Sequence, residues 1–231
     1  MKGKLYGIGT GPGDPELLTL KAISTIQKCQ IIAVPKTSHS ERTAFSIIEE
    51  YLDGKELLDC RFAMDKDISK REEARQIVAS RIIECLDCGK DVGFITLGDP
   101  TTYSTYMYVH KIVANKGYNA EIIPGITSYT AAASELGIAL CEGNEILTLI
   151  PSGHEEPLNE LLDNPGTKVL MKSGKNLSNV LKALKAKENT INVKIACRAT
   201  MKNQRLYSSI EEYENSPEAG YFTLVIVKEN E

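Results

Sequence analysis

Residues 7–15 read Gly7-Ile8-Gly9-Thr10-Gly11-Pro12-Gly13-Asp14-Pro15, with glycine at every second position as far as Gly13. Glycine weakens the interior of a strand, but it adopts unusual dihedral angles and lets other atoms approach the backbone closely. The preceding Lys4-Leu5-Tyr6 is typical of the end of a short strand. Asp14 is a good helix N-cap, and Pro15 suits the first helical position. This stretch therefore predicts a strand, a tight turn and a helix.

The glycine spacing fits neither of two common nucleotide-binding motifs. The dinucleotide fingerprint needs glycine at its sixth position, which is Pro12 when counted from Gly7 and Asp14 when counted from Gly9. A phosphate-binding P-loop needs Gly-Lys followed by Ser or Thr, and this chain has no such run. An acidic residue at the helix start would also repel a phosphate there. From the loop alone, a tight turn without a ligand remains an alternative.

Length and composition indicate an ordinary globular protein. The chain has 231 residues, 42% of them hydrophobic and 25% charged, which fits one large domain or two small ones. A net charge of −4 without a long basic run argues against nucleic acid as the main partner. No apolar run approaches the roughly 18 residues of a membrane span, and Gly and Pro interrupt any N-terminal signal-like stretch. We therefore expect a cytoplasmic protein without a membrane partner.

Cysteine and histidine predict no metal site and no disulfide scaffold. The six cysteines are too few for a scaffold in a chain of this size. Cys85 and Cys88 have metal-binding or redox spacing, but no second pair follows, and Gly89 after them is a helix stop signal. The three histidines, at positions 39, 110 and 154, are scattered.

Hydrophobic patterning predicts alternating strands and helices in the first half of the chain. Helices are expected at 15–29, 43–51, 69–88 and from Pro100 to about 117, and strands at 4–6, 30–34, 91–97 and 119–123. Such alternation favours a mostly parallel sheet with helices on both faces.

The second half has a different pattern. A helix that opens within residues 124–129 is expected to run to Glu135. Strands are expected at 145–150, 167–172, 193–199, 204–208 and 221–227, and further helices at about 155–163, 177–186 and 209–215. The close spacing of the last strands indicates antiparallel pairing and a mixed sheet. We therefore predict two α/β domains, residues 1–123 and 124–231.

Polar loops follow two of the expected strands. Leu97-Gly98-Asp99-Pro100 comes after one strand, and Pro124-Gly125-Ile126-Thr127-Ser128 comes after another and opens a helix. Ligands of open α/β sheets bind beyond the carboxyl ends of strands. We expect the Gly98-Asp99 loop to contact a ligand together with the glycine-rich loop. At the start of the other helix, capping alone would explain one of the hydroxyls of Thr127 and Ser128. An Asp-Pro turn that only caps the next helix is the alternative for Asp99.

The three loops, in this order and spacing, resemble the tetrapyrrole (corrin/porphyrin) methylase family, which uses S-adenosylmethionine. The resemblance continues with Val169-Leu170-Met171-Lys172-Ser173-Gly174-Lys175-Asn176 and Arg198-Ala199-Thr200, and so covers almost the whole chain. Residues 5–22 are most similar to the group that methylates C-20 of metal-free precorrin-2 or of cobalt-factor II (cobalt-precorrin-2). No residue separates these two substrates.

The resemblance implies two domains with the cofactor in the trough between them, and a homodimer. By matching motif positions, it implies cofactor contacts from Pro12, Gly98, Asp99, Thr102, Thr127, Ser128, Ser173, Ala199 and Thr223. Other members carry a bulkier residue at the position of Ser173 and glycine at that of Ala199.

The implied substrate is a polycarboxylate, which an acidic protein binds through a local positive patch. Lys36, Lys172 and Arg198 are the candidates, and Arg42, Lys175 and Lys202 are weaker ones. Methyl transfer needs mainly positioning of the two reactants, and a base can then remove the proton from the methylated carbon. Asp99, Tyr103 and His39 are weak candidates for that base.

Three functions remain open. The first is C-20 methylation, and the second is methylation of a different corrin or porphyrin position, or of another acceptor, by another member of the family. The third is a different class, either a binding protein without catalysis or a dinucleotide oxidoreductase, and the failed glycine fingerprint argues against the oxidoreductase.

Overall fold

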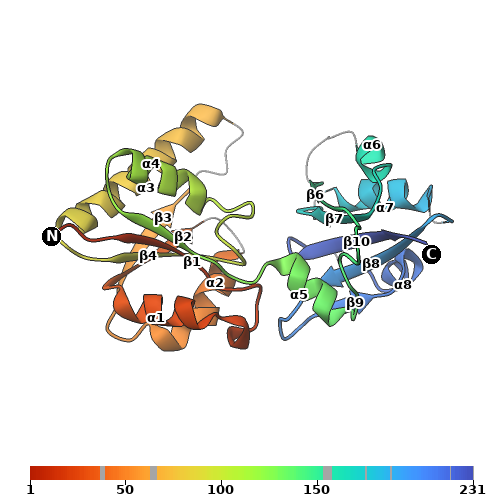
Figure 1. Cartoon of the computed structure of the whole chain (residues 1–231), viewed down its shortest axis with the longest axis horizontal. Coiled ribbons are helices and arrows are strands. Elements are labelled where there is room, and N and C mark those ends of the chain that lie inside the picture. Colours follow the sequence, from red (N-terminus) through yellow and green to blue (C-terminus); the bar gives the residue numbers. More distant parts are fainter. Residues whose placement is uncertain are drawn as a thin grey trace. The chain divides into compact units, whose positions relative to one another are not determined.

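The computed structural model describes residues 1–36, 40–62, 67–152, 158–174, 176–187, 189–218 and 220–230, with backbone only at 40–42. The chain forms two compact units, Met1–Thr127 and Ser128–Glu231 (Figure 1). The boundary between these units, after Thr127, lies slightly later than the one predicted between residues 123 and 124. The loop after the last strand of the first half therefore belongs to the first unit.

The first unit has a five-stranded sheet in the order β3-β2-β4-β1-β5, and every adjacent pair is parallel. Its strands are β1 (Leu5–Gly9), β2 (Ile31–Lys36), β3 (Glu56–Arg61), β4 (Val92–Thr96) and β5 (Ala120–Ile123). Its helices are α1 (Leu20–Lys28), α2 (Ser40–Ile48), α3 (Ile68–Asp87) and α4 (Tyr106–Asn115), with short 3-10 turns η1 (Pro15–Leu17) and η2 (Glu49–Tyr51). The predicted parallel sheet is confirmed.

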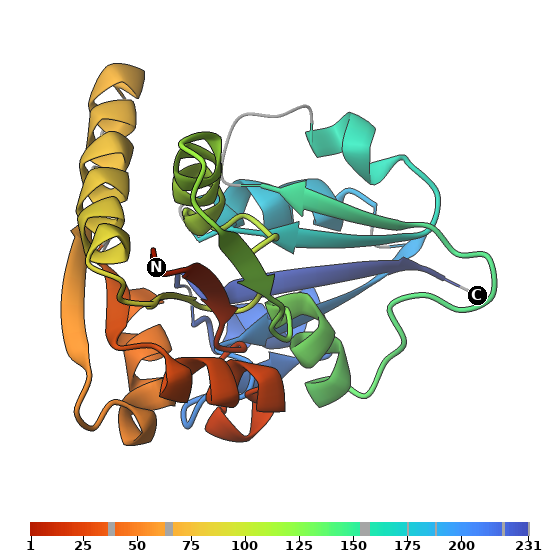
Figure 2. The ribbon, with the colours of Figure 1, turned by 60° about the vertical axis from the view of Figure 1, so that its left-hand side comes forward.

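Helices cover both faces of this sheet, as Figures 1 and 2 show. Leu5, Phe94 and Tyr106 belong to the buried cluster under α3 and α4, whereas Ile8 and Ile95 belong to the cluster under α1 and α2. Successive strand residues point to opposite faces, so neighbouring positions supply the two clusters. Because all five strands are parallel, their carboxyl ends and the loops that follow them share one edge of the sheet.

Three local predictions for this unit were wrong. The helix expected from Pro15 is interrupted, because Asp14 caps only η1 and the Thr19 side chain then caps α1 at Ala22 N. The helix expected from Pro100 begins only at Tyr106. Strand β3 was not predicted; it is an edge strand in which only Cys60 is buried, so it lacks the apolar run of a central strand.

Strand β1 continues to Gly9, so the first two glycines of the loop lie inside a strand. A Cβ at Gly7 would come within 2.0 Å of Tyr106 Cε1 and 2.1 Å of Tyr106 Cζ. The Tyr106 ring is fully buried, and its hydroxyl donates to Glu121 O at 3.2 Å and meets His110 Nδ1 at 2.9 Å. At Gly7 it is therefore the protein's own side chain that approaches the backbone closely.

Replacing Gly7 by alanine should lower the free energy of unfolding by about 1–3 kcal/mol, because the Tyr106 ring must move within a filled core. Denaturant unfolding of the variant measures this loss. The double variant with Tyr106→Leu lacks Cε1 and Cζ, the two closest of the three clashing ring atoms, so the second substitution should cost less in the Gly7→Ala background than alone. Equal costs in both backgrounds would show that the ring does not require this glycine.

The second unit has a mixed sheet in the order β6-β7-β10-β8-β9. Its strands are β6 (Leu147–Pro151), β7 (Thr167–Met171), β8 (Ile191–Cys197), β9 (Arg205–Tyr207) and β10 (Thr223–Glu229), and its helices are α5 (Ser128–Glu135), α6 (Leu158–Leu162), α7 (Leu177–Lys185) and α8 (Ile210–Asn215). Strands β6 and β7 are parallel, while β10 is antiparallel to β7 and β8. The predicted mixed sheet is confirmed.

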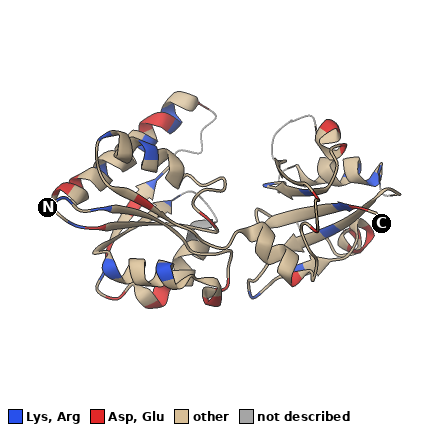
Figure 3. Ribbon diagram, viewed as in Figure 1, with Lys and Arg blue, Asp and Glu red and all other residues tan. Residues whose placement is uncertain are grey.

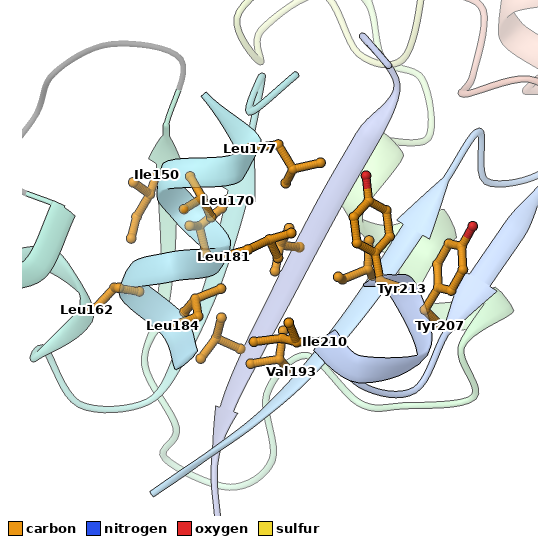
Figure 4. Packing of buried hydrophobic residues seen from close by; sticks show 14 of the residues in the cluster. Ile150, Leu162, Leu170, Leu177, Leu181, Leu184, Val193, Tyr207, Ile210 and Tyr213 are labelled. Atoms are coloured by element: carbon orange, nitrogen blue, oxygen red, sulfur yellow. The ribbon is translucent and has the colours of Figure 1, made fainter. Parts of the chain in front are cut away.

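One face of this second sheet is packed by three helices. Leu177, Leu181 and Leu184 of α7 lie against the strands, and Leu162 of α6 and Ile210 and Tyr213 of α8 extend the same cluster (Figure 4). On the other face, α5 contributes Ala132 and Ala133 to a smaller cluster. Among the described residues, no helix is long and apolar enough to cross a membrane.

Candidate functional site

The loops after β1 and β4 are joined by backbone hydrogen bonds at the carboxyl edge of the first sheet. Gly98 N donates to Gly11 O at 2.7 Å, and Gly11 N donates to Gly98 O at 3.3 Å. Thr10 is completely buried, and its N donates to Thr96 O at 2.9 Å. The glycine-rich loop and the Gly98-Asp99 loop, which are far apart in the sequence, therefore form one substructure.

Asp99 connects this substructure to the loop after β5. Its Oδ2 accepts a hydrogen bond from Gly125 N at 3.0 Å, and its Oδ1 accepts from Thr101 N at 2.8 Å and from the Thr101 hydroxyl. Only 8% of Asp99 is exposed. Both carboxylate oxygens thus accept from the protein itself. Asp99 closes a turn with Thr101 and also binds a second loop, but it does not cap the next helix, which begins only at Tyr106.

Glycine permits the close contact between these loops. A Cβ at Gly9 would lie 2.6 Å from both Gly125 N and Gly98 O. A Cβ at Gly125 would lie 2.3 Å from Gly98 O and 2.9 Å from Gly9 C. Real Cβ atoms do not approach backbone atoms so closely. The three sequence motifs of the first unit therefore meet at one place, as the sequence predicted.

The other predicted residues of the first unit lie on or beside these loops. Pro12 is buried, Thr102 is half-buried with its N donating to Asp99 O at 3.3 Å, and Tyr103 is exposed. Thr127 directly precedes α5, and Ser128 is the first residue of that helix and belongs to the second unit. Each of these five residues stays a predicted ligand contact or, for Tyr103, a predicted base.

Two further predictions for this unit concern residues outside the three loops. Lys36, the last residue of β2, is exposed, and its Nζ lies 3.5 Å from Asp59 Oδ1. His39, a candidate base, lies outside the described residues.

In the second unit the carboxyl ends of β6, β7 and β8 share an edge with the amino end of β10. Ser173 follows β7 and is fully buried, and its hydroxyl lies 2.6 Å from that of Ser152 after β6. Ser152 also donates to Met171 O at 3.2 Å, and Asn176 Nδ2 donates to Ser152 O at 3.0 Å. Ser152 was not predicted; its place two residues after the strand expected at 145–150 was the available signal.

Thr223 and Ala199 lie at the same edge. Thr223 is buried at the start of β10, where its hydroxyl accepts from Gly220 N at 3.3 Å and lies 3.5 Å from Cys197 Sγ. Ala199 is buried two residues after the end of β8. A Cβ at Gly174 would lie 2.9 Å from Gly220 O, so the loop after β7 also contacts the segment before β10.

The two cationic candidates of this unit are in different states. Arg198 forms an ion pair with Glu218, and its Nε donates to Asn203 O at 3.2 Å. Burial lowers the pKa of Lys172 from its ordinary value. The charge of Arg198 is thus already balanced by Glu218 of the same unit. A substrate carboxylate would have to compete with Glu218 for the guanidinium.

Unusual backbone geometry is concentrated in these loops. Among the described residues, the non-glycine residues with positive φ are Tyr103 (52°), Lys172 (60°), Arg198 (53°) and Thr200 (67°). All four follow β4, β7 or β8 at the carboxyl edges. For a β-branched residue such as Thr200 this conformation is a genuine outlier, and such strain is typical of ligand-binding and active sites.

In the described part of the chain, no three His, Cys, Asp or Glu side chains form a group that could hold a metal ion.

Comparison with known sequences gives one consistent result. A family profile described as Tetrapyrrole (Corrin/Porphyrin) Methylases matches residues 4–213. A probable cobalt-precorrin-2 C(20)-methyltransferase of Methanocaldococcus jannaschii is 35% identical, with 97% of this chain and 96% of that protein covered. A precorrin-2 C(20)-methyltransferase of a Sinorhizobium species is 32% identical, with 97% and 95% covered.

Solved structures agree on the fold. A cobalt precorrin-4 methyltransferase of cobalamin biosynthesis superposes with a TM-score of 0.79 at 21% identity, covering 97% of this chain and 94% of that one. A uroporphyrin-III C-methyltransferase of Thermus thermophilus in complex with S-adenosylhomocysteine gives a TM-score of 0.73 at 20% identity, with 98% and 97% covered.

Proposed function

The chain belongs to the tetrapyrrole (corrin/porphyrin) methylase family, and on that premise we propose that it methylates C-20 of precorrin-2 or cobalt-precorrin-2 with S-adenosylmethionine, in cobalamin biosynthesis. The observation that carries the proposal is 35% identity to a cobalt-precorrin-2 C(20)-methyltransferase over almost the full length of both proteins. A relative named for precorrin-2 is nearly as similar, so whether the substrate carries cobalt stays open.

The loops of the first unit fit a bound cofactor. Gly98 has a positive φ of 73°, and a Cβ there would meet no atom closer than Ile126 O at 3.9 Å. Space for a ligand atom therefore adjoins this backbone, in the position where α/β sheets bind ligands. Pro12, Gly98, Thr102 and Thr127 are the proposed contacts there. The contacts implied for Ser128, Ser173, Ala199 and Thr223 in the second unit stay predictions.

Positioning is the main contribution that this chain can make to the reaction. When bound, S-adenosylmethionine supplies the methyl group on a sulfonium, and the acceptor carbon must lie in line with the bond that breaks. Rigid loops hold such a geometry best, and the hydrogen bonds of Asp99 fix two of the loops relative to each other. Because both of its oxygens already accept hydrogen bonds, Asp99 suits this task better than proton removal.

The alternative function is methylation of a different corrin or porphyrin position, which the uroporphyrinogen-III methyltransferases among the relatives favour. A homodimer and a cytoplasmic location, expected from the sequence, are part of the proposal.

Two measurements test the proposal. S-adenosylhomocysteine at a hundredfold excess over its Kd should raise the melting temperature by roughly 5–10 °C, since binding to the folded state alone contributes about 2.7 kcal/mol. Incubation with methyl-labelled S-adenosylmethionine and either cobalt-factor II or metal-free precorrin-2 should then give a product that carries one added methyl group, located at C-20 by NMR.

Each outcome separates two hypotheses. A methyl group at another carbon would favour the alternative, and cofactor binding without transfer to either tetrapyrrole would favour a binding protein. A melting temperature that does not respond to S-adenosylhomocysteine would contradict both methyltransferase proposals.

A further inference from the structure

Arg71 lies in the first turn of α3, close to the carboxyl edge of the first sheet. Strand β3 ends at Arg61 and α3 begins at Ile68, so the amino end of α3 starts from the carboxyl edge. Helix α3 packs beside α4, which begins after the Gly98-Asp99 loop. Figure 3 shows both basic and acidic residues on α3, so the partners of each arginine must be considered separately.

Arg71 has a donor that the protein does not satisfy. The side chain is half-buried, and its Nε is shielded from solvent without a hydrogen-bond partner among the described residues. A buried polar atom without a partner is uncommon, and leaving one unpaired typically costs about 1–3 kcal/mol. An acceptor brought by a ligand would remove this cost.

The other arginines of α3 differ in this respect. Arg75 pairs with Glu72 at 3.1 Å, and its guanidinium lies 3.6 Å from the centre of the Tyr108 ring. Arg81 donates to Asp59 O at 2.6 Å. The unsatisfied donor is therefore a property of Arg71 and not of arginines on this helix in general.

The carboxylate that caps α3 does not supply the missing acceptor. Asp67 caps α3, where its Oδ1 accepts from Ser69 N at 2.9 Å and from the Ser69 hydroxyl at 2.7 Å. These bonds, with a smaller contribution from the charge of Arg71, lower the pKa of Asp67. Asp67 thus remains ionised and balances part of the charge of Arg71, but the Nε–H group still has no acceptor.

We infer that Arg71 binds a carboxylate of the substrate. A guanidinium binds a carboxylate through two parallel hydrogen bonds. This inference rests on the proposed function, because precorrin-2 is a polycarboxylate. It gives the first unit a substrate-binding residue that the sequence motifs do not contain.

Substrate kinetics of Arg71→Gln test the inference. With cobalt-factor II or precorrin-2, whichever the wild type methylates, KM should rise about tenfold, as expected for the loss of a charge-assisted hydrogen bond. Affinity for S-adenosylhomocysteine and the melting temperature should stay at wild-type values. Arg71→Lys keeps the charge without the Nε–H group, so its KM should fall between those of wild type and Arg71→Gln.

Lys116→Gln is the matched control. Lys116 is exposed at the carboxyl-terminal end of α4, away from the carboxyl edge of the sheet. Its replacement by glutamine removes one positive charge, as Arg71→Gln does. If Arg71→Gln and Lys116→Gln have the same KM, the inference fails while the proposed function stands. A wild type that binds S-adenosylhomocysteine but neither tetrapyrrole would overturn both. A lower melting temperature with unchanged KM would mean that Arg71 only stabilises the start of α3.

Discussion

Replacing Gly125 by alanine is expected to abolish binding of S-adenosylhomocysteine and to lower the free energy of unfolding by at least about 3 kcal/mol, at the upper end of the cost of overpacking. The added Cβ would lie 2.3 Å from Gly98 O and 2.9 Å from the backbone of Gly9. These are backbone atoms of two neighbouring loops, so no side-chain rotation can relieve the clash. The loops after β1 and β4 must move away from the loop after β5.

Calorimetric titration and urea unfolding measure the two effects of Gly125→Ala. Gly220→Ala is the control, because a Cβ at Gly220 would meet no atom within 4 Å and its φ is not positive. That variant should unfold like the wild type. If Gly125→Ala bound S-adenosylhomocysteine normally, the contact among the three loops would not be needed for cofactor binding.

Replacing Asp99 by alanine should weaken S-adenosylhomocysteine binding about a hundredfold and lower the free energy of unfolding by about 2–4 kcal/mol, because buried N–H donors lose a charged acceptor. The donors are Gly125 N and Thr101 N, at 3.0 Å and 2.8 Å. Without the carboxylate the loops after β4 and β5 lose their direct connection. Asp53→Ala, at an exposed aspartate in the turn before β3, controls for the loss of one negative charge.

Asp99→Asn separates the positioning role from a catalytic one. The amide oxygen can still accept from Thr101, but the amide nitrogen cannot accept from Gly125 N. A positioning role predicts weaker S-adenosylhomocysteine binding for this variant. If Asp99 is instead the base, binding should stay normal while kcat falls.

The architecture was accessible from the sequence because it depends on local patterns. Alternating strands and helices predicted the parallel sheet, and parallel strands place their following loops at one edge. That rule was enough to bring the motifs at Gly11, Gly98 and Gly125 together. The resemblance of these motifs to a known family then gave a function that the comparisons support.

The contacts between individual side chains and loops could not be predicted from the sequence, because they join residues far apart in the chain. Nothing around Gly7 indicates that its partner is the ring of Tyr106, and nothing around Asp99 indicates that it binds Gly125 N. The interruption between η1 and α1 depends on which of two capping side chains, Asp14 or Thr19, starts the longer helix. Arg71 was overlooked because an arginine on an amphipathic helix looks like an ordinary surface residue.

The non-glycine residues with positive φ have a practical consequence for engineering this protein. Glycine adopts positive φ without strain, so a library selected for heat resistance alone should accumulate Gly at Lys172, Arg198 and Thr200. Those replacements would remove the side chains from the loops at the carboxyl edge of the second sheet. Given the proposed contacts of Lys172 and Arg198 with the substrate, a thermostable variant obtained in that way would fold well and turn over poorly, so selection needs turnover as a second criterion.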